Sequence, residues 1–171
     1  ESYTHLNPVA NNLFKGFKDL ENLRAGKSIQ RRIYNHESGN HDPEIAIRPR
    51  KNIVYEGLHS LYDNNTRDLL DLSIYIDVEP DIKKEWKIDR DTQERGYTVE
   101  EVIRSISKRS KDEKRYIEGQ IEHADAIIGI RRENGEDILE IRDVSTERIS
   151  KKYLDILESL TVLYKEYVCS I

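Results

Sequence analysis

Glu56 stands where a carboxylate could take part in phosphate chemistry. It directly follows the short apolar run 52–55, which has the pattern of a buried parallel strand, and Gly57 comes next. Ligands of α/β sheets bind beyond the carboxyl ends of the strands, and a carboxylate there can hold Mg²⁺ directly or through water beside a nucleotide's phosphates. The alternative interpretation is a solvated loop residue or a helix cap.

A second set of charged side chains lies along a predicted helix. Lys87, Arg90 and Asp91 share one face, because residues three and four apart are neighbours, and Arg95 lies one turn beyond Asp91. Phosphoryl transfer spreads negative charge over the migrating group, and fixed Lys and Arg side chains stabilise that charge. The alternative is a solvated helix whose arginines pair internally with Asp91.

The elements that must position these residues have the pattern of an α/β fold. Short apolar runs predict strands, and apolar residues at helical spacing predict helices. The predicted elements are strands over 52–55 and 72–78 and helices over 81–96 and 98–114, the second helix opening with a capping-box pattern of Thr98 and Glu101. Strands that alternate with helices imply a mainly parallel sheet with crossovers.

The flanking segments extend this fold on both sides. Apolar spacing predicts a helix over 8–24, and the polar stretch 28–50, with glycine and prolines, predicts an irregular connection. Further on, Asn134-Gly135 between two alternating runs predicts a β-hairpin. Residues 145–167 predict an amphipathic C-terminal helix.

Composition narrows the class of protein. The length of 171 residues suits one domain over 1–171, and the net charge of −5 argues against broad nucleic-acid or membrane-surface binding. A basic cluster is therefore expected to serve a small anion. The sequence has no run of about 18 apolar residues and no signal-peptide pattern, from which we expect a cytoplasmic location. Cys169 is the single cysteine, so the chain cannot form an internal disulfide.

Eight short motifs over residues 4–128 resemble the phosphoribulokinase family in their order and spacing. They are more similar to the plant, cyanobacterial or archaeal type than to the uridine kinases. The motifs are His5-Leu6-Asn7-Pro8-Val9-Ala10-Asn11-Asn12, Gly26-Lys27, Ile33-Tyr34-Asn35-His36, Tyr55-Glu56-Gly57-Leu58-His59, Arg67-Asp68-Leu69-Leu70-Asp71, Trp86-Lys87-Ile88-x-Arg90-Asp91, Glu94-Arg95-Gly96 and Tyr116-Ile117-x-x-Gln120.

The resemblance implies a three-layer P-loop kinase fold and a reaction. Such a kinase transfers the γ-phosphoryl group of ATP to the 1-hydroxyl of ribulose 5-phosphate, with Mg²⁺ as cofactor. By position, Glu56 matches the family's carboxylate at the metal, and Lys87 and Arg90 match residues that face the transferring phosphoryl group.

The resemblance also implies how the two small-molecule substrates are held. Arg95 matches the residue that binds the sugar phosphate, for which a bidentate cation is suited. Tyr34 and His36 match the tyrosine and histidine of the acceptor-binding loop, and Arg109 falls in the basic lid that closes over ATP. The family often pairs edge strands between subunits, so a homodimer is expected, with the predicted hairpin as a possible edge.

Parts of the family pattern do not occur in the sequence. It contains neither a G-x-x-x-x-G-K-[ST] loop nor the family's upstream aspartate, it begins with Glu1, and it has no methionine. We therefore expect one kinase domain that lacks its N-terminal P-loop unit, so that residues 1–171 alone are inactive. Gly119 replaces a family proline, and the sequence after Ile130 departs from the plant pattern.

Two other functions remain open. A kinase of the same fold could act on uridine or another sugar phosphate, although Arg95 and His36 favour a phosphorylated acceptor. A non-catalytic interaction module without a P-loop is the second alternative.

Overall fold

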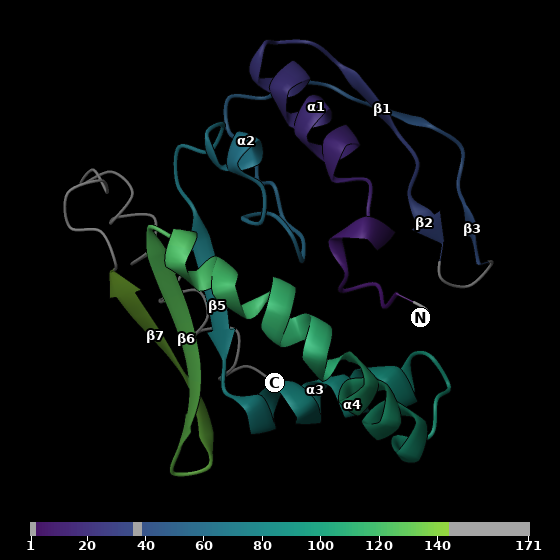
Figure 1. Cartoon of the computed structure of the whole chain (residues 1–171), viewed down its shortest axis with the longest axis vertical. Coiled ribbons are helices and arrows are strands. Elements are labelled where there is room, and N and C mark those ends of the chain that lie inside the picture. Colours follow the sequence, from purple (N-terminus) through teal and green to yellow (C-terminus); the bar gives the residue numbers. More distant parts are fainter. Residues whose placement is uncertain (1–2, 36–38, 144–171) are drawn as a thin grey trace.

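The fold is that of a computed structural model of the whole chain, which describes residues 3–35 and 39–143 (Figure 1). Apart from one helix of 12 residues near the N-terminus, the first half of the described chain contains only short helices and strands, and the two longest helices and the largest sheet follow. In chain order the elements are η1 (Pro8–Ala10), α1 (Leu13–Arg24), β1 (Ile29–Arg31), β2 (Tyr34–Asn35), β3 (Asn40–His41), β4 (Ile45–Ile47), α2 (Asn64–Arg67), β5 (Ile74–Val78), α3 (Pro80–Gln93), α4 (Val99–Tyr116), η2 (Glu118–His123), β6 (Ala126–Glu133) and β7 (Glu136–Asp143).

The largest sheet has the strand order β5-β6-β7 (Figure 1). β5 and β6 run parallel, with Ile74 paired with Ala126 and Val78 paired with Ile130. Between these strands the chain passes through α3, α4 and η2, so the connection is a helical crossover. β7 turns back antiparallel to β6. The predicted α/β class is confirmed, with a mixed sheet that contains a parallel pair.

The core lies along β6 and beneath the two long helices. β6 buries its first five residues, 126–130. Ile82 of α3 and Val102 of α4 are 1% and 2% exposed, and the two helices pack against each other (Figure 1). Burial of one such aliphatic side chain contributes about 1.5–3 kcal/mol. These contacts therefore anchor α3, the helix that carries the charged residues.

Two local motifs form as predicted. β6 and β7 meet at Asn134 and Gly135, whose φ angles of 52° and 84° suit a two-residue hairpin turn. At the start of α4 the hydroxyl of Thr98 accepts a hydrogen bond from the Glu101 N–H, and the Glu101 carboxylate accepts one from the Thr98 N–H. Both motifs depend on residues that are near neighbours in the sequence.

The predicted helix over 8–24 is interrupted. Asn7 caps the short helix η1, whose first residue is Pro8, and the backbone leaves the helical conformation at Asn11. The side chain of Asn12 then accepts a hydrogen bond from the Lys15 N–H and starts α1. Asparagine side chains favour caps over helix interiors, which explains the break.

The stretch 28–50, predicted to be irregular, contains four short strands. β1 pairs with β4 and β2 pairs with β3, both antiparallel. Among the described residues of these four strands, Ile29 is the one that is buried. All the other strand residues are exposed or half-buried. Such strands have no regular apolar alternation, so the pattern that predicts strands does not reveal them.

The predicted strand over 52–55 is wrong. These residues belong to no helix or strand, and Val54 is 90% exposed. A strand requires a hydrogen-bonding neighbour, and the segment has none among residues 3–35 and 39–143. Glu56 therefore lies in a loop.

The remaining predictions concern the long elements and the C-terminal region. The strand predicted over 72–78 is observed as β5, and the helix predicted over 81–96 is α3, which ends at Gln93. The predicted helix 145–167 and Cys169 lie outside the described residues. Among the residues that are described, no helix has both the length and the apolar character to cross a membrane.

Candidate functional site

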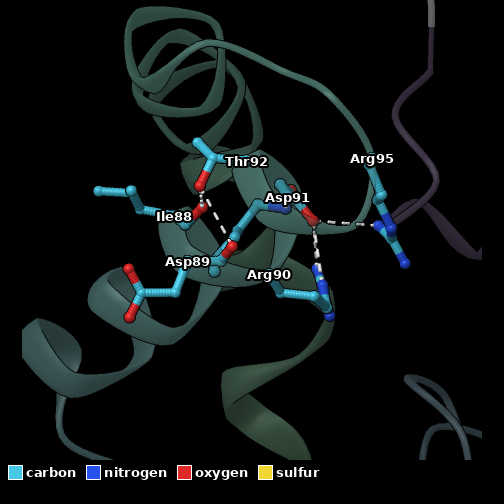
Figure 2. A network of polar contacts seen from close by, with 7 residues as sticks. Ile88, Asp89, Arg90, Asp91, Thr92 and Arg95 are labelled. Carbon is cyan, nitrogen blue, oxygen red and sulfur yellow. Dashed lines mark hydrogen bonds and ion pairs between the residues drawn. The ribbon is translucent and has the colours of Figure 1, made fainter.

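Asp91 gathers three cations at the C-terminal end of α3. Its carboxylate lies 2.6 Å from Lys87 Nζ, 2.9 Å from Arg90 Nη2 and 3.1 Å from Arg95 Nη1. Figure 2 shows Arg90 and Arg95 directed at the same carboxylate oxygen. We call these four residues the Asp91 cluster. All the residues of the predicted charged set thus meet at one point.

The helix and its end place these side chains. Lys87 lies one turn before Asp91, so the two share a face. α3 ends at Gln93, and the chain then turns through Gly96, whose φ of 70° is in the left-handed region that favours glycine. The N–H of Tyr97 donates to the carbonyl of Asp91 at 3.1 Å. This turn brings Arg95 back towards the helix.

Ion pairs fix α3 itself on two sides. Arg132 of β6 lies 2.6 Å from Glu85 of α3, and its backbone N–H donates to the Glu79 carboxylate just before the helix. On the other side Lys83 pairs with Glu113 of α4. The Asp91 cluster therefore stands on a helix that is tied to both the sheet and α4.

The charges of the cluster do not balance. Asp91 has 7% of its side chain exposed, whereas Arg90 and Arg95 keep 47% and 35% exposed. Burial raises the pKa of Asp91, but hydrogen bonds and charges from Lys87 and Arg90 outweigh it and hold that pKa below its usual value. The carboxylate is thus ionised at neutral pH. Three cations around one carboxylate leave a net positive site with free guanidinium edges, which suits a phosphate group.

The charges of Arg109 on α4 and of Lys87 on α3 both act on the imidazole of His5. Burial lowers the pKa of His5, and the charges of Arg109, Lys87 and His59 lower it further. Charges act on a ring in this way only when they are near it. One residue earlier, the Thr4 hydroxyl donates to the Asp112 carboxylate of α4 at 2.6 Å, so the N-terminal segment lies against α4.

The other residues predicted for the site are not joined to the cluster. Glu56 is exposed, and within the described part of the chain its carboxylate makes no ion pair. Tyr34 lies in β2, where its ring meets the ring of His41 edge-on at 5.4 Å. His36 lies outside the described residues. His59 is buried, and its Nε2 lies 2.9 Å from the carbonyl oxygen of Leu6.

Glu56 fits a shared magnesium site better than Asp91 does. Mg²⁺ is usually held by one or two carboxylates together with water and substrate phosphates, and the exposed Glu56 carboxylate offers one such ligand. Asp91 is already engaged by three cations. In the described part of the chain no three His, Cys, Asp or Glu side chains stand close enough to form a complete metal site by themselves.

Sequence reasoning understated the part played by Asp91. The spacing from Lys87 to Arg95 revealed the shared face, and internal pairing with Asp91 was the alternative to a site. The structure shows this internal pairing, and the same ion pairs that satisfy Asp91 hold the cations side by side. The feature of the sequence that indicates this role of Asp91 is its position, one helical turn from both Lys87 and Arg95.

A family model supports the resemblance that the motifs suggested. The model of the phosphoribulokinase / uridine kinase family matches residues 1–136. The chain belongs to this family. The matched residues 1–136 include all eight motifs and the whole Asp91 cluster.

Two phosphoribulokinases and a uridine kinase are similar to most of this chain. Phosphoribulokinase of Synechocystis sp. is 43% identical over 127 residues, which are 74% of this chain and 38% of that protein. Chloroplastic phosphoribulokinase of Spinacia oleracea is 43% identical over 130 residues, 76% of this chain and 32% of that protein. A uridine kinase of Staphylococcus epidermidis is 35% identical over 112 residues, 64% of this chain and 54% of that protein. The match thus spans only about a third of each phosphoribulokinase.

A solved structure of the family has the same fold. The phosphoribulokinase from Rhodobacter spheroides superposes with a TM-score of 0.65 and 24% sequence identity, over 90% of this chain and 63% of that chain. At this identity the likeness concerns the fold alone. It supports a P-loop kinase-like α/β architecture for this family member.

Proposed function

We propose that this protein is a phosphoribulokinase, which transfers the γ-phosphoryl group of ATP to the 1-hydroxyl of ribulose 5-phosphate. The observation that carries the proposal is the Asp91 cluster, in which Lys87, Arg90 and Arg95 surround one buried carboxylate. A site with surplus positive charge suits an acceptor that already bears a phosphate. The higher identity to phosphoribulokinases than to uridine kinases supports the same acceptor.

Each cation of the cluster has a distinct role in this proposal. Arg95 binds the phosphate of the sugar, since its guanidinium lies beyond the helix end and one third of the side chain is exposed. Lys87 and Arg90 stabilise the charge that spreads over the migrating phosphoryl group. Asp91 is a positioning residue that holds all three in place.

Other residues complete the substrate sites in the proposal. Arg109 approaches the ATP phosphates from α4, and Tyr34 and His36 contact the acceptor. Glu56 is the protein ligand of Mg²⁺, which when bound neutralises charge on the ATP phosphates. The oxygen of the 1-hydroxyl bonds to the γ-phosphorus, the bond to ADP breaks, and the hydroxyl proton leaves to a base.

A test of the acceptor separates this proposal from the uridine kinase alternative. ADP release by the native protein is measured with Mg²⁺ and ATP, first with ribulose 5-phosphate and then with uridine. We expect turnover with ribulose 5-phosphate and at least a hundredfold lower kcat/KM for uridine, because a site built for a charged group discriminates strongly against an acceptor that lacks it. Turnover of uridine alone would contradict the proposal.

The proposal includes a homodimer that pairs sheet edges. β7 follows β6 at one end of the order β5-β6-β7, and within the described residues no further strand pairs with it. An eight-residue strand edge offers unpaired N–H and C=O groups to a second copy. Light scattering on the native protein should give twice the mass of one chain, and a monomer at micromolar concentration would contradict this part of the proposal.

A further inference from the structure

The four short strands β1 to β4, which we call the ribbon, extend away from α1 (Figure 1). β1 runs beside α1, and β2 and β3 lie at the other end of the ribbon. Among the described residues of these strands, Ile29 of β1 is the one that is buried, with 7% of its surface exposed. Burial of apolar surface therefore contributes little to holding the ribbon, and polar contacts with α1 become important.

Asp19 of α1 joins the helix to β1. Its side chain is 11% exposed, and its carboxylate lies 2.9 Å from Lys15 Nζ and 3.3 Å from Arg31 Nε. Lys15 lies one turn earlier on the same helix, and its Nζ also donates to the carbonyl oxygen of Gln30 at 3.3 Å. Arg31 is the last residue of β1. Two contacts, from Asp19 to Arg31 and from Lys15 to Gln30, thus tie α1 to the end of β1.

Burial distinguishes Asp19 from Glu21, the other acidic residue of α1. Glu21 pairs with Lys18 at 2.8 Å, but both of these side chains are nearly half exposed. Such exposed pairs contribute little to stability. The Asp19 carboxylate is largely removed from water, so its charge-assisted bonds to the two cations are stronger. The stronger pair therefore connects the helix with the ribbon, and the weaker one stays within the helix.

The ion pair of Asp19 and Arg31 lies close to Tyr34 along the chain. Three residues of extended chain reach at most about 11 Å, so the position of Arg31 limits where β2 can start. Tyr34 is the first residue of β2, and its ring meets that of His41 of β3 edge-on at 5.4 Å. A change in the position of Arg31 therefore displaces Tyr34, and β3 with it.

We infer that Asp19 is a positioning residue for the acceptor, because its ion pair with Arg31 sets where the ribbon holds Tyr34. The inference rests on the proposed function, in which Tyr34 contacts the acceptor. Loss of the ion pair should weaken acceptor binding and leave ATP binding and phosphoryl transfer unchanged. Lys87 and Arg90, which act on the migrating group in the proposed function, are held by Asp91 on α3 and not by the ribbon.

Amide hydrogen exchange tests the attachment of the ribbon without any substrate. In Asp19→Asn and in Arg31→Gln the amides of residues 29–31 and 45–47 should exchange about fivefold faster than in the native protein, because the ribbon opens more often. Arg31 is 45% exposed, so its substitution removes the ion pair without opening the core. Glu21→Gln removes the same charge from the same helix and should leave exchange within about twofold. Unchanged exchange in both Asp19→Asn and Arg31→Gln would overturn the inference.

Michaelis constants test the consequence for the acceptor. In Asp19→Asn and Arg31→Gln the KM for ribulose 5-phosphate should rise at least about threefold, while the KM for ATP and kcat stay within about twofold. A general loss of folded protein would instead lower the apparent kcat and leave both Michaelis constants unchanged. The double variant should raise the acceptor KM no further than the larger single effect, since both substitutions remove one ion pair. Equal increases for the two substrates, or a double variant that multiplies the single effects, would overturn the inference.

The two tests separate this inference from the proposed function. A native protein that phosphorylates uridine and not ribulose 5-phosphate contradicts the proposed function, and the KM for uridine then takes the place of the KM for the sugar phosphate in the comparison. Faster exchange together with an unchanged acceptor KM would mean that the ion pair holds the ribbon without positioning Tyr34. That result overturns the inference and leaves the proposed function intact.

Discussion

Arg95 returns to the helix that precedes it, and its Nη1 lies 3.1 Å from Asp91 Oδ1 although α3 has already ended at Gln93. The turn that carries Arg95 is shaped by the left-handed backbone of Gly96 and by the hydrogen bond from the Tyr97 N–H. The ion pair with Asp91 adds a contact that fixes the guanidinium itself. With it, Arg95 lies beside Arg90 at the Asp91 carboxylate (Figure 2), and Lys87 completes one net positive site. The position of the proposed phosphate-binding arginine thus depends on a residue that need not touch the substrate.

Asp91→Asn should lower the stability of the protein. The amide cannot balance three nearby cations, so their repulsion and lost hydrogen bonds should reduce the free energy of unfolding by about 1–3 kcal/mol at neutral pH. Urea denaturation measures the change. Asp89→Asn is the matched control, because Asp89 is exposed on the same helix and its carboxylate makes no ion pair in the described part of the chain. Equal effects of the two substitutions would contradict the role of Asp91.

Acid should destabilise the protein through Asp77. Burial raises its pKa, but hydrogen bonds from Arg131 and Arg142, at 2.7 and 2.9 Å, outweigh this and hold the pKa below the ordinary value of 3.8. The unfolded chain then binds the proton more readily, so this contribution is complete above pH 3.8 and is lost as pH falls through the folded pKa. Unfolding free energies measured from pH 6 to pH 2.5 should fall less steeply for Asp77→Asn than for the native protein. Parallel curves would exclude Asp77 as a source of acid sensitivity.

Gly16→Ala should destabilise α1, against the usual effect of this substitution in a helix. Alanine normally gains about 1 kcal/mol over glycine there. A Cβ at Gly16, however, would lie 2.5 Å from the hydroxyl oxygen of Tyr55, while the next ring atom is 3.7 Å away. The double variant Gly16→Ala/Tyr55→Phe removes that hydroxyl and should recover the stability of Tyr55→Phe or exceed it. Thermal unfolding of all three variants checks this, and a more stable Gly16→Ala single variant would show that Tyr55 moves at no cost.

Features set by nearby residues could be predicted from the sequence. The capping box of Thr98 and Glu101 and the turn at Asn134-Gly135 form within a few residues of chain. The prediction of a strand over 52–55 was wrong because an apolar run forms a strand only beside a second strand. The described residues supply no such neighbour there.

The candidate site likewise combines features that spacing in the sequence predicts with features that depend on distant parts of the fold. The spacing of Lys87 and Asp91 on one helix predicted their shared face. The burial of Asp91 depends on how α3 packs, and the return of Arg95 depends on the turn after the helix, so neither could be derived from spacing. Glu56 lies in a loop and Tyr34 in β2, and among the described residues neither makes an ion pair or hydrogen bond with the Asp91 cluster.

The most direct test of the account is the pair of Michaelis constants for Arg95→Gln, measured on the native protein with ribulose 5-phosphate and ATP each varied in turn. We expect the KM for ribulose 5-phosphate to rise at least tenfold, because one charge-assisted bond to its phosphate is lost, while the KM for ATP changes less than about twofold. Arg104→Gln, an exposed arginine of α4, is the control and should change neither constant. Equal increases in both constants for Arg95→Gln, or no increase at all, would contradict the assignment of the Asp91 cluster to the acceptor phosphate.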